Sequence, residues 1–411
     1  MSTPLNAGTR PLRIVMLTQG YYPKVGGAER QVTAVSQELT RRGVEVHVIT
    51  RSLPGTPSRE TLAGVTVYRL PAPRPKVFAS LSFTFNALAL IRRIQPDVLH
   101  AHELLSPTTT AVLARQLNRI PVVVTLHGGG EIRRMQQKFF GASRLRYFST
   151  HVERFIAIDA DIDTQLASLG IPDRLRVSIP NGVDISRFRP LSPDQKAEMR
   201  SQLNLPPGPL VIFTGRLVGL KRVDQLIAAW ARVHQEFPQA TLLIAGDGTE
   251  GLVLKQAAYS GHADSGAQHE SGVRFLGEIQ DVAPYLQAAD LFVLPSRYEG
   301  LSVALLESMA SGLAAIATDV GGNVDLINHL QTGWLVSGED GSELPVRLAE
   351  AMQTLLSDEP LRSRLAQNGR EFVEQSYSLE SVAEKLNRLY LTVMDAAVAP
   401  GLRDSHSKGV L

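Results

Sequence analysis

Short apolar runs bounded by turn residues alternate with helical stretches from one end of the 411-residue chain to the other. Such alternation is typical of α/β proteins, in which each buried parallel strand is followed by a crossover helix. In the first half the strand-like segments are RIVMLTQ, VEVHVIT, VTVYRL, DVLHAH, PVVVTLH and RFIAID. In the second half they are PLVIFTG, ATLLIAG, VRFLG, LFVLP, AAIAT and GWLV. We therefore predict two doubly wound, Rossmann-like domains of similar size.

The two series of strands are separated by the segment PNGVDISRFRPLSPDQ, which is rich in proline and other turn residues. On this basis we place an N-terminal domain at 1–190 and a C-terminal domain at 191–378. Residues 379–398 are amphipathic and predict a final helix, whereas residues 399–411 predict a disordered tail. The cleft between two such sheets is the default position for a ligand.

Composition narrows the classes of function. The net charge of +2 is too small to indicate nucleic acid as a main partner. Without cysteine the chain has no disulfide, thiol nucleophile or thiolate metal site, which fits a reducing cytoplasm. The first ten residues lack the apolar core of a signal peptide, and the longest uncharged apolar stretch, residues 77–91, is too short and too polar to span a bilayer. We expect a cytoplasmic protein.

Two carboxylates, Glu299 and Glu307, flank the start of a predicted helix that follows the strand-like run LFVL. The pattern predicts that this helix begins near Ser302 and ends at Gly312. In an open α/β sheet, ligands bind beyond the carboxyl ends of the strands. The two carboxylates can bind the hydroxyls of a sugar or ribose there, while the free N–H groups of the helix take an anion. The alternative is that Glu299 caps the helix and Glu307 is solvated.

The segment TGRLVGLKRVD follows the first strand of the second half and places Arg216 and Lys221 on either side of a turn. Two cations there can neutralise the charge of a departing nucleoside diphosphate, or they are solvated loop charges. In the first half, Gly26 and Gly27 precede Glu29 and open a helix. Adjacent glycines let the backbone approach a phosphate closely, and a plain strand-to-helix turn is the alternative.

A literal GxGxxG pattern occupies residues 246–251, after the strand-like run TLLIA. It is the main sign of a competing function, a dinucleotide-dependent oxidoreductase. The loop follows the second strand of its domain, however, whereas the dinucleotide fingerprint follows the first. The acidic candidates about twenty residues further on, Asp264 and Glu270, fall in a polar loop instead of at a strand end.

His127 follows the run PVVVTL, so we expect it at the carboxyl end of a strand, facing the cleft. A hydrogen-bonded structural histidine is the alternative. The HGGG pattern that begins at His127 can form an esterase oxyanion hole, but the chain has no GxSxG nucleophile elbow. We interpret His100 and His102, in DVLHAHE, as packing or loop residues.

Three alternating aspartates and two basic stretches have more than one interpretation. Because the aspartates begin a helix, capping is favoured over a divalent metal site, and we predict no required metal. The aspartates are Asp159, Asp161 and Asp163. The basic stretches can form a solvated helix face or dock on an anionic membrane. Their residues are Lys76 to Phe83, and Arg133, Arg134, Lys138, Arg144, Arg146 and Arg154.

The segment EGLSVALLESMASG, with Glu299 and Glu307 eight positions apart, resembles the donor-binding signature of the retaining glycosyltransferases of family 4. That family has the two-domain GT-B fold. Further matching segments occur in the family's order along both halves of the chain. They lie at 26–29, 127, 181–184, 214–224, 246–248 and 318–322. The chain departs from the family pattern at Leu301-Ser302, where Phe-Gly or Phe-Pro is common, at Ala314, where proline is common, and at Asp325, which replaces a common glutamate.

The resemblance implies transfer of a sugar from a UDP-sugar or GDP-sugar to an acceptor hydroxyl with retention of configuration. The transferred group would be a hexose or an N-acetylhexosamine, and no metal or other cofactor would be needed. Catalytic roles would fall to Arg216 and Lys221 on the leaving diphosphate, to Glu299 on the sugar hydroxyls and to His127 beside the reacting carbon. Glu307 would bind the ribose. The other implied donor contacts are Gly26, Gly27, Gly215, Gly246, Asp247, Gly248, Gly300, Leu301 and Ser302.

The resemblance also implies partners and a place in metabolism. The acceptor would be a glycan or a lipid-linked glycan, in glycan, polysaccharide or glycolipid biosynthesis. The N-terminal domain would form the acceptor side and the C-terminal domain the donor side, with the final helix crossing back to the N-terminal domain. Peripheral attachment to the inner face of an anionic membrane would fit the basic stretches. An inactive nucleotide-sugar-binding partner subunit is the alternative function, and intact Glu299, Glu307, Arg216 and Lys221 argue against it.

Overall fold

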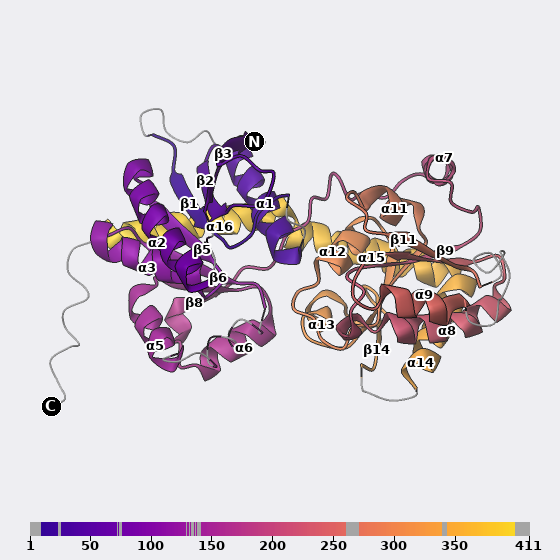
Figure 1. Ribbon diagram of the computed structural model, residues 1–411. Helices are drawn as coiled ribbons and strands as arrows, with labels where there is room; N and C mark the ends of the chain where they lie inside the picture. The colour runs from indigo at the N-terminus through magenta and orange to yellow at the C-terminus, as the bar shows by residue number, and fades with distance from the viewer. Residues whose placement is uncertain are drawn as a thin grey trace. The chain divides into compact units, whose positions relative to one another are not determined.

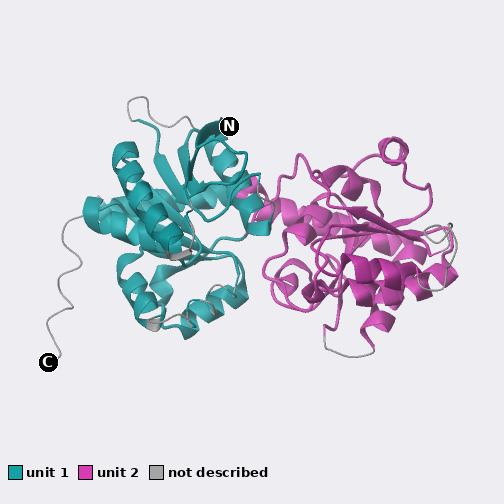
Figure 2. Ribbon diagram, in the orientation of Figure 1, with its two compact units in different colours: residues 1–180, 382–411 teal, residues 181–381 magenta. Residues whose placement is uncertain are grey.

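The chain forms two compact α/β units. The computed structural model describes residues 10–23, 26–71, 73, 76–128, 130, 132, 135, 137, 141–259, 271–338 and 343–398 (Figure 1). Unit 1 comprises residues 1–180 and 382–411, and unit 2 comprises residues 181–381 (Figure 2). The predicted tail at 399–411 lies outside the described residues, as do Asp264, Glu270, Arg133, Arg134 and Lys138 and the side chain of Lys76.

Unit 1 is built on a sheet whose eight described strands have the order β3-β4-β2-β1-β5-β6-β7-β8. Neighbouring strands are parallel except β3 and β4, which form an antiparallel pair at one edge. The order reverses between β1 and β5, which is the topological switch point of a doubly wound sheet. The strands are β1 (Arg13–Leu17), β2 (Glu45–Arg51), β3 (Arg59–Leu62), β4 (Val65–Leu70), β5 (Val98–His102), β6 (Val122–Leu126), β7 (Arg154–Ala157) and β8 (Arg176–Ser178).

Helices connect most of these strands, as is usual for crossovers between parallel strands, but β2, β3 and β4 follow one another without a helix. The described helices are α1 (Gly27–Arg41), α2 (Lys76–Ile94), α3 (Ser106–Asn118), α5 (Gly141–His151), α6 (Ala160–Ser168) and the short η1 (Asp173–Leu175). The last helix, α16 (Leu379–Val398), begins in unit 2 and belongs to unit 1 from Val382 onwards. There the buried Tyr390 lies 2.7 Å from Nδ1 of His100 in β5, so α16 packs against the sheet of unit 1.

Unit 2 contains a wholly parallel sheet whose six described strands have the order β11-β10-β9-β12-β13-β14. The strands are β9 (Leu210–Thr214), β10 (Thr241–Ala245), β11 (Val273–Gly277), β12 (Leu291–Leu294), β13 (Ala314–Thr318) and β14 (Trp334–Val336). The described helices are α7 (Pro193–Gln202), η2 (Gly219–Lys221), α8 (Val223–Glu236), α9 (Gly251–Tyr259), α11 (Ala283–Ala288), α12 (Val303–Ala310), α13 (Asn323–Leu326), α14 (Leu344–Ser357) and α15 (Glu359–Tyr377).

The switch point of unit 2 lies between β9 and β12, which are hydrogen-bonded neighbours although they are far apart in the chain. Both strands are buried along their whole length, as expected of apolar runs in a sheet covered on both faces. The loops that leave their carboxyl ends begin at Gly215 and Pro295 and therefore emerge side by side. The predicted doubly wound α/β class is confirmed for both units.

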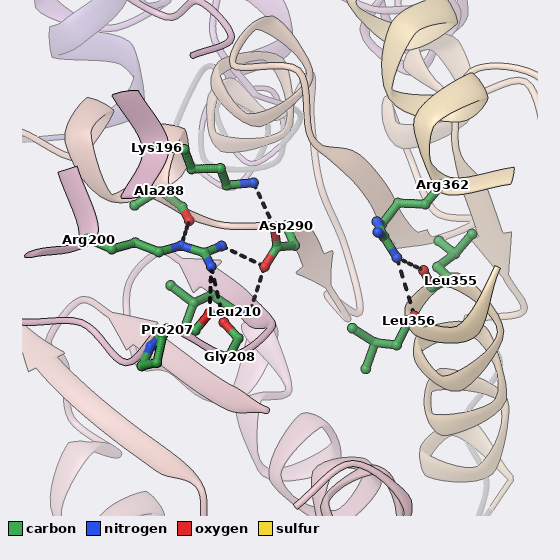
Figure 3. A network of polar contacts seen from close by, with 10 residues as sticks. All are labelled: Lys196, Arg200, Pro207, Gly208, Leu210, Ala288, Asp290, Leu355, Leu356 and Arg362. Atoms are coloured by element: carbon green, nitrogen blue, oxygen red, sulfur yellow. Dashed lines mark hydrogen bonds and ion pairs between the residues drawn. The ribbon is translucent and has the colours of Figure 1, made fainter. Parts of the chain in front are cut away.

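A polar network fixes α7 at the opposite, amino edge of the same sheet (Figure 3). Asp290, just before β12, accepts hydrogen bonds from Lys196 and Arg200, each at 2.7 Å, and from the Leu210 amide at 2.8 Å. Burial alone would raise the pKa of Asp290, but the two cations lower it below its ordinary value. Because this cluster lies at the edge away from the switch-point loops, its role is to hold α7 onto the sheet.

The structure places the division between the units at 180/181, ten residues before the predicted boundary at 190/191. The difference has a physical cause, because the turn-rich segment is hydrogen-bonded into unit 2. Val183 donates its N–H to the Tyr377 carbonyl at 2.9 Å and accepts from the Leu379 amide at 3.0 Å. The carbonyl of Arg187 accepts a hydrogen bond from Gln287 at 3.0 Å. The proline and turn residues predicted a connection between the units, but they did not indicate that this connection is attached to unit 2.

Candidate functional site

Lys221 and Glu299, predicted separately from two segments, form an ion pair at the switch point of unit 2. Lys221 ends η2 after β9, and Glu299 lies in the loop after β12. The Lys221 ammonium donates to Oε1 of Glu299, and the buried Ser296 hydroxyl donates to the same oxygen at 2.6 Å. The side chains are 19% and 11% exposed, respectively. A cation and a carboxylate are thus held together, with some access to solvent, beyond the carboxyl ends of two central strands.

The loop from Glu299 enters α12 as the sequence predicted. Ser302 is the N-cap, and its hydroxyl accepts a hydrogen bond from the Leu305 amide at 3.4 Å. The suggestion that Glu299 caps this helix is therefore wrong, because Ser302 does so and Glu299 binds Lys221. The suggestion that Glu307 is solvated is also wrong, since Glu307 is only 7% exposed. Glu307 lies one turn inside α12, where a buried carboxylate requires polar partners.

Two neighbouring segments support this loop. Asn181 donates from Nδ2 to the Leu301 carbonyl at 3.3 Å and is itself buried. Gly321, with φ of +49°, packs its backbone against the Glu299 carbonyl so closely that a Cβ there would come within 3.0 Å of that oxygen. The TDVGG turn after β13 therefore fixes the position of the Glu299 backbone through a close contact that only glycine allows.

The glycines of the GxGxxG pattern pack against the other switch-point loop. A Cβ on Gly246 would collide with the Gly215 carbonyl, and a Cβ on Gly248 with the Leu217 carbonyl. The Leu217 amide donates to the Asp247 carbonyl at 2.9 Å, which joins the two loops. These glycines thus serve loop-to-loop packing, while the side chain of Arg216 in the adjacent loop is exposed to solvent.

In unit 1, three histidine rings lie one after another and form a ladder: His100, His102 and His127. Nε2 of His127 lies 3.0 Å from Nδ1 of His102, and the two rings are stacked. His102 in turn packs against His100 with ring centroids 4.1 Å apart and the rings tilted by 32°. His100 is fixed at both nitrogens, 2.7 Å from the Tyr390 hydroxyl and 2.7 Å from that of Thr125. The two side chains that we interpreted as packing or loop residues are buried in β5, and one of them holds His127.

Burial keeps this ladder uncharged. Loss of hydration lowers the pKa of His127 to about 4, although the nearby Glu29 opposes the shift. Burial, followed by the neighbouring His127, lowers the pKa of His100 to about 3, and the pKa of His102 is also well below its ordinary value. His127 is therefore a neutral hydrogen-bonding group at pH 7 and not an imidazolium.

The glycine pair at the start of α1 is a helix N-terminus that already carries a carboxylate. Gly26 is the N-cap, and Glu29 is in the first turn. A Cβ on Gly26 would lie within 3.0 Å of Oε2 of Glu29, so the glutamate side chain folds back over the glycine. Gly27 is exposed. This geometry matches the strand-to-helix turn that we gave as the alternative, and it leaves the Gly27 backbone accessible.

Comparison with known proteins agrees with the geometry of both units. The family described as Glycosyltransferase Family 4 matches residues 25–187, and the one described as Glycosyl transferases group 1 matches residues 208–358. A D-inositol 3-phosphate glycosyltransferase of Frankia alni is 30% identical over 371 residues, which cover 83% of this chain and 88% of the relative. The chain belongs to glycosyltransferase family 4.

Other family 4 proteins extend over nearly the whole chain. The N-acetyl-alpha-D-glucosaminyl L-malate synthase of Bacillus anthracis is 26% identical, with 91% of this chain and 96% of the relative covered. The solved structure of sucrose-phosphate synthase from Thermosynechococcus elongatus has a TM-score of 0.75 at 26% identity, with 94% of this chain and 100% of that chain covered. The fold is GT-B, and the chain is a glycosyltransferase. The oxidoreductase alternative is thereby replaced, and glycine packing accounts for the GxGxxG pattern.

The remaining predicted features of this glycosyltransferase have structural roles where the structure describes them. Asp159 is the N-cap of α6 and accepts a hydrogen bond from the Ile162 amide at 2.8 Å, as the capping interpretation predicted. Asp161 accepts from Gln165 at 2.8 Å within the same helix. Arg154 donates to a backbone carbonyl. Among the described residues, no helix combines the length and apolar character needed to cross a bilayer.

Several residues that position the candidate side chains within each unit were not predicted from the sequence. Ser296, Asn181 and Tyr390 were not predicted, and His102 was predicted only as a packing or loop residue. The available signals were weak. Asn181 lies in a PNG segment that matched the family, and His102 ends an HxH in a strand whose alternate side chains share one face.

Proposed function

We propose that this glycosyltransferase moves a sugar from a UDP-sugar or GDP-sugar to an acceptor hydroxyl with retention of configuration. The observation that supports this most directly is the cation-carboxylate pair of Lys221 and Glu299 at the switch point of unit 2. Nucleotides bind at such switch points in doubly wound sheets. The transferred sugar would be a hexose or N-acetylhexosamine, and the product would belong to glycan, polysaccharide or glycolipid biosynthesis.

The proposed donor contacts follow from the position of each group. Lys221 stabilises the diphosphate as negative charge develops on it, with the exposed Arg216 reaching the same group. Glu299 accepts hydrogen bonds from the sugar hydroxyls, and Glu307 binds the ribose. The N–H groups of the Leu301-Ser302 segment, at the start of α12, contact phosphate oxygens. No step in this scheme requires a metal ion, because cations of the protein neutralise the leaving group.

Transfer itself would proceed by attack of the acceptor hydroxyl on the same face that the diphosphate leaves. The departing phosphate oxygen accepts the proton of the hydroxyl, so no protein nucleophile is needed. His127, held neutral by burial, donates or accepts a hydrogen bond beside the reacting carbon without bringing a positive charge there. The ion pair with Glu299 holds the Lys221 ammonium at the carboxyl edge of the sheet before the donor arrives.

Titration calorimetry with UDP, GDP, ADP and NAD, each with and without EDTA, tests this proposal. We expect tight binding of one nucleoside diphosphate that EDTA leaves unchanged, and turnover with the corresponding nucleotide sugar. Loss of binding with EDTA would contradict the metal-independent scheme. Binding of NAD alone would overturn the proposal. Binding without turnover toward any acceptor would favour the inactive partner subunit.

A second proposal is peripheral contact of unit 1 with an anionic membrane, which suits a lipid-linked acceptor at the inner face. Phe78, Leu81 and Phe85 in α2 are 59%, 50% and 70% exposed and recur at helical spacing on one stripe. The 19-residue helix has no acidic residue, and Arg92 and Arg93 lie in its last turn. An apolar stripe with cations at the helix end is the pattern of an interfacial helix.

Phe85→Ser is expected to weaken sedimentation of the protein with phosphatidylglycerol vesicles by severalfold, because each buried apolar side chain adds to interfacial binding. Leu252→Ser is the matched control, since Leu252 is 79% exposed but lies in α9 of unit 2. Equal binding of the wild type to phosphatidylcholine and phosphatidylglycerol vesicles, or equal effects of the two substitutions, would contradict the proposal.

A further inference from the structure

Two arginines from different elements of unit 1 converge on the first turn of α3. Arg51, the last residue of β2, donates from Nη2 to the Ser106 hydroxyl at 3.1 Å. Arg144, in α5, donates from Nη2 to the Thr109 hydroxyl at 2.6 Å. Ser106 and Thr109 are three residues apart and so lie on the same face of α3. Both guanidinium groups therefore end on one helical turn.

Neither guanidinium has a carboxylate partner in the described part of the chain. The other contacts of Arg51 are the Ser80 hydroxyl at 3.5 Å and the Phe83 ring at 6.0 Å, and its Nε is buried without a hydrogen-bond partner. Arg144 otherwise lies over the ring of Phe148 at 5.8 Å. Burial lowers the pKa of Arg144, and among the residues that the structure describes no neighbouring anion offsets that loss of hydration.

Two other arginines of unit 1, one partly and one fully buried, pair with glutamates. Arg115 pairs with Glu153 at 2.8 Å, and Arg69 pairs with Glu60. Removing a cation from water without a counter-charge is costly, so proteins normally pair such groups. Arg51 and Arg144 lack such a carboxylate among the described residues, and their counter-charge is expected to come from a ligand.

The surroundings of the two arginines favour an anion. The first turn of α3 has no acidic residue, and its N-cap, Leu105, provides no side-chain cap. The positive end of a 13-residue helix dipole therefore adds to the two guanidinium charges. Arg51 ends β2 and α3 follows β5, so the cluster lies at the carboxyl edge of the sheet, the edge that also carries His102 and His127.

We infer that Arg51 and Arg144 form a subsite for the phosphate or carboxylate group of an anionic acceptor. This inference rests on the proposed function and deepens it, since it names the class of acceptor. Guanidinium groups bind these oxyanions through paired hydrogen bonds, and the Ser106 and Thr109 hydroxyls hold both groups in position. An acceptor anchored there would be held at the same sheet edge as His127, where we place the transfer step.

Calorimetric titration of the full chain with inorganic phosphate and with malate tests the subsite. The titrations are made in saturating UDP and GDP, so that the donor side of unit 2 is filled. Arg144→Gln is expected to weaken binding of at least one of the two anions tenfold or more, and Arg51→Gln likewise. Arg146→Gln is the matched control, because Arg146 is an exposed arginine two positions along the same helix. Thermal unfolding of each variant shows whether it is folded.

The outcomes separate this inference from the proposed function. If a nucleoside diphosphate binds but neither anion binds, or if Arg146→Gln weakens binding as much as Arg144→Gln does, the subsite is refuted and the donor assignment stands. If no nucleoside diphosphate binds, the proposed function fails. Tighter binding of phosphate than of malate would identify a phosphate ester. Displacement of the bound phosphate by vesicles containing phosphatidylinositol, but not by phosphatidylcholine vesicles, would then identify a lipid headgroup as the source of the oxyanion.

Discussion

Lys221→Ala lowers the turnover of sugar transfer by roughly 10²- to 10³-fold and leaves unit 2 folded. An electrostatic group placed where charge develops in the transition state contributes on this order. The substitution removes the cation that the structure holds at the switch point, but Glu299 keeps its hydrogen bond from Ser296 at 2.6 Å. The loss of stability is therefore small compared with the loss of rate. Steady-state kinetics with the nucleotide sugar that binds, together with thermal unfolding, measures both quantities.

Arg232→Ala is the matched control for this experiment, because it removes an exposed cation from α8 of the same unit. It should change neither turnover nor unfolding. Full turnover in Lys221→Ala would refute the assignment of Lys221 to the leaving diphosphate. A rise in KM with unchanged kcat would mean that Lys221 binds ground state and transition state equally.

Apolar runs predicted nearly all the central strands, because a strand buried on both faces tolerates little else. The strand β3 was not predicted, because it is not an apolar run. Its sequence, RETL, is polar, and it lies at the sheet edge, where only β4 supplies hydrogen bonds. The turn between the two strands contains Ala63 and Gly64, both with positive φ. The local sequence of β3 therefore gives little indication of a strand, and pairing with β4 determines the conformation of β3.

The residues of the candidate site were predictable one at a time, but not their contacts. Lys221 and Glu299 are 78 positions apart, and they meet because β9 and β12 are neighbours in the sheet. The order of strands in a sheet is a property of the whole unit, which no short motif contains. The contact of His100 with Tyr390 spans 290 positions and depends on where the last helix packs. Likewise, the sequence showed the glycines at 246 and 248, but it did not predict the loop against which they pack.

Gly321→Ala is expected to reduce kcat/KM by about 10²-fold and to destabilise unit 2 by roughly 2–4 kcal/mol. A new Cβ would overlap the Glu299 carbonyl, so either the TDVGG turn or the Glu299 loop must move. A displacement of about 1 Å at a positioning group is enough to cost two orders of magnitude in rate. Because the loop also carries Leu301 and Ser302, donor binding should weaken together with turnover. Titration with the nucleoside diphosphate and chemical denaturation measure these effects.

The control must separate the clash from the strain of a positive φ, since alanine at φ of +49° costs about 1–2 kcal/mol by itself. Gly277→Ala provides this control, because Gly277 has φ of +71° in the same unit and, its chain neighbours aside, no atom of the described residues lies within 4 Å of its added Cβ. It should lose stability through strain alone and keep its kcat/KM. If the two substitutions reduced kcat/KM equally, backbone contact between Gly321 and Glu299 would not be what positions the donor loop. A selective loss in Gly321→Ala would show that the contact of Gly321 with the Glu299 carbonyl acts on transfer through the backbone, since Gly321 has no side chain to reach the substrate.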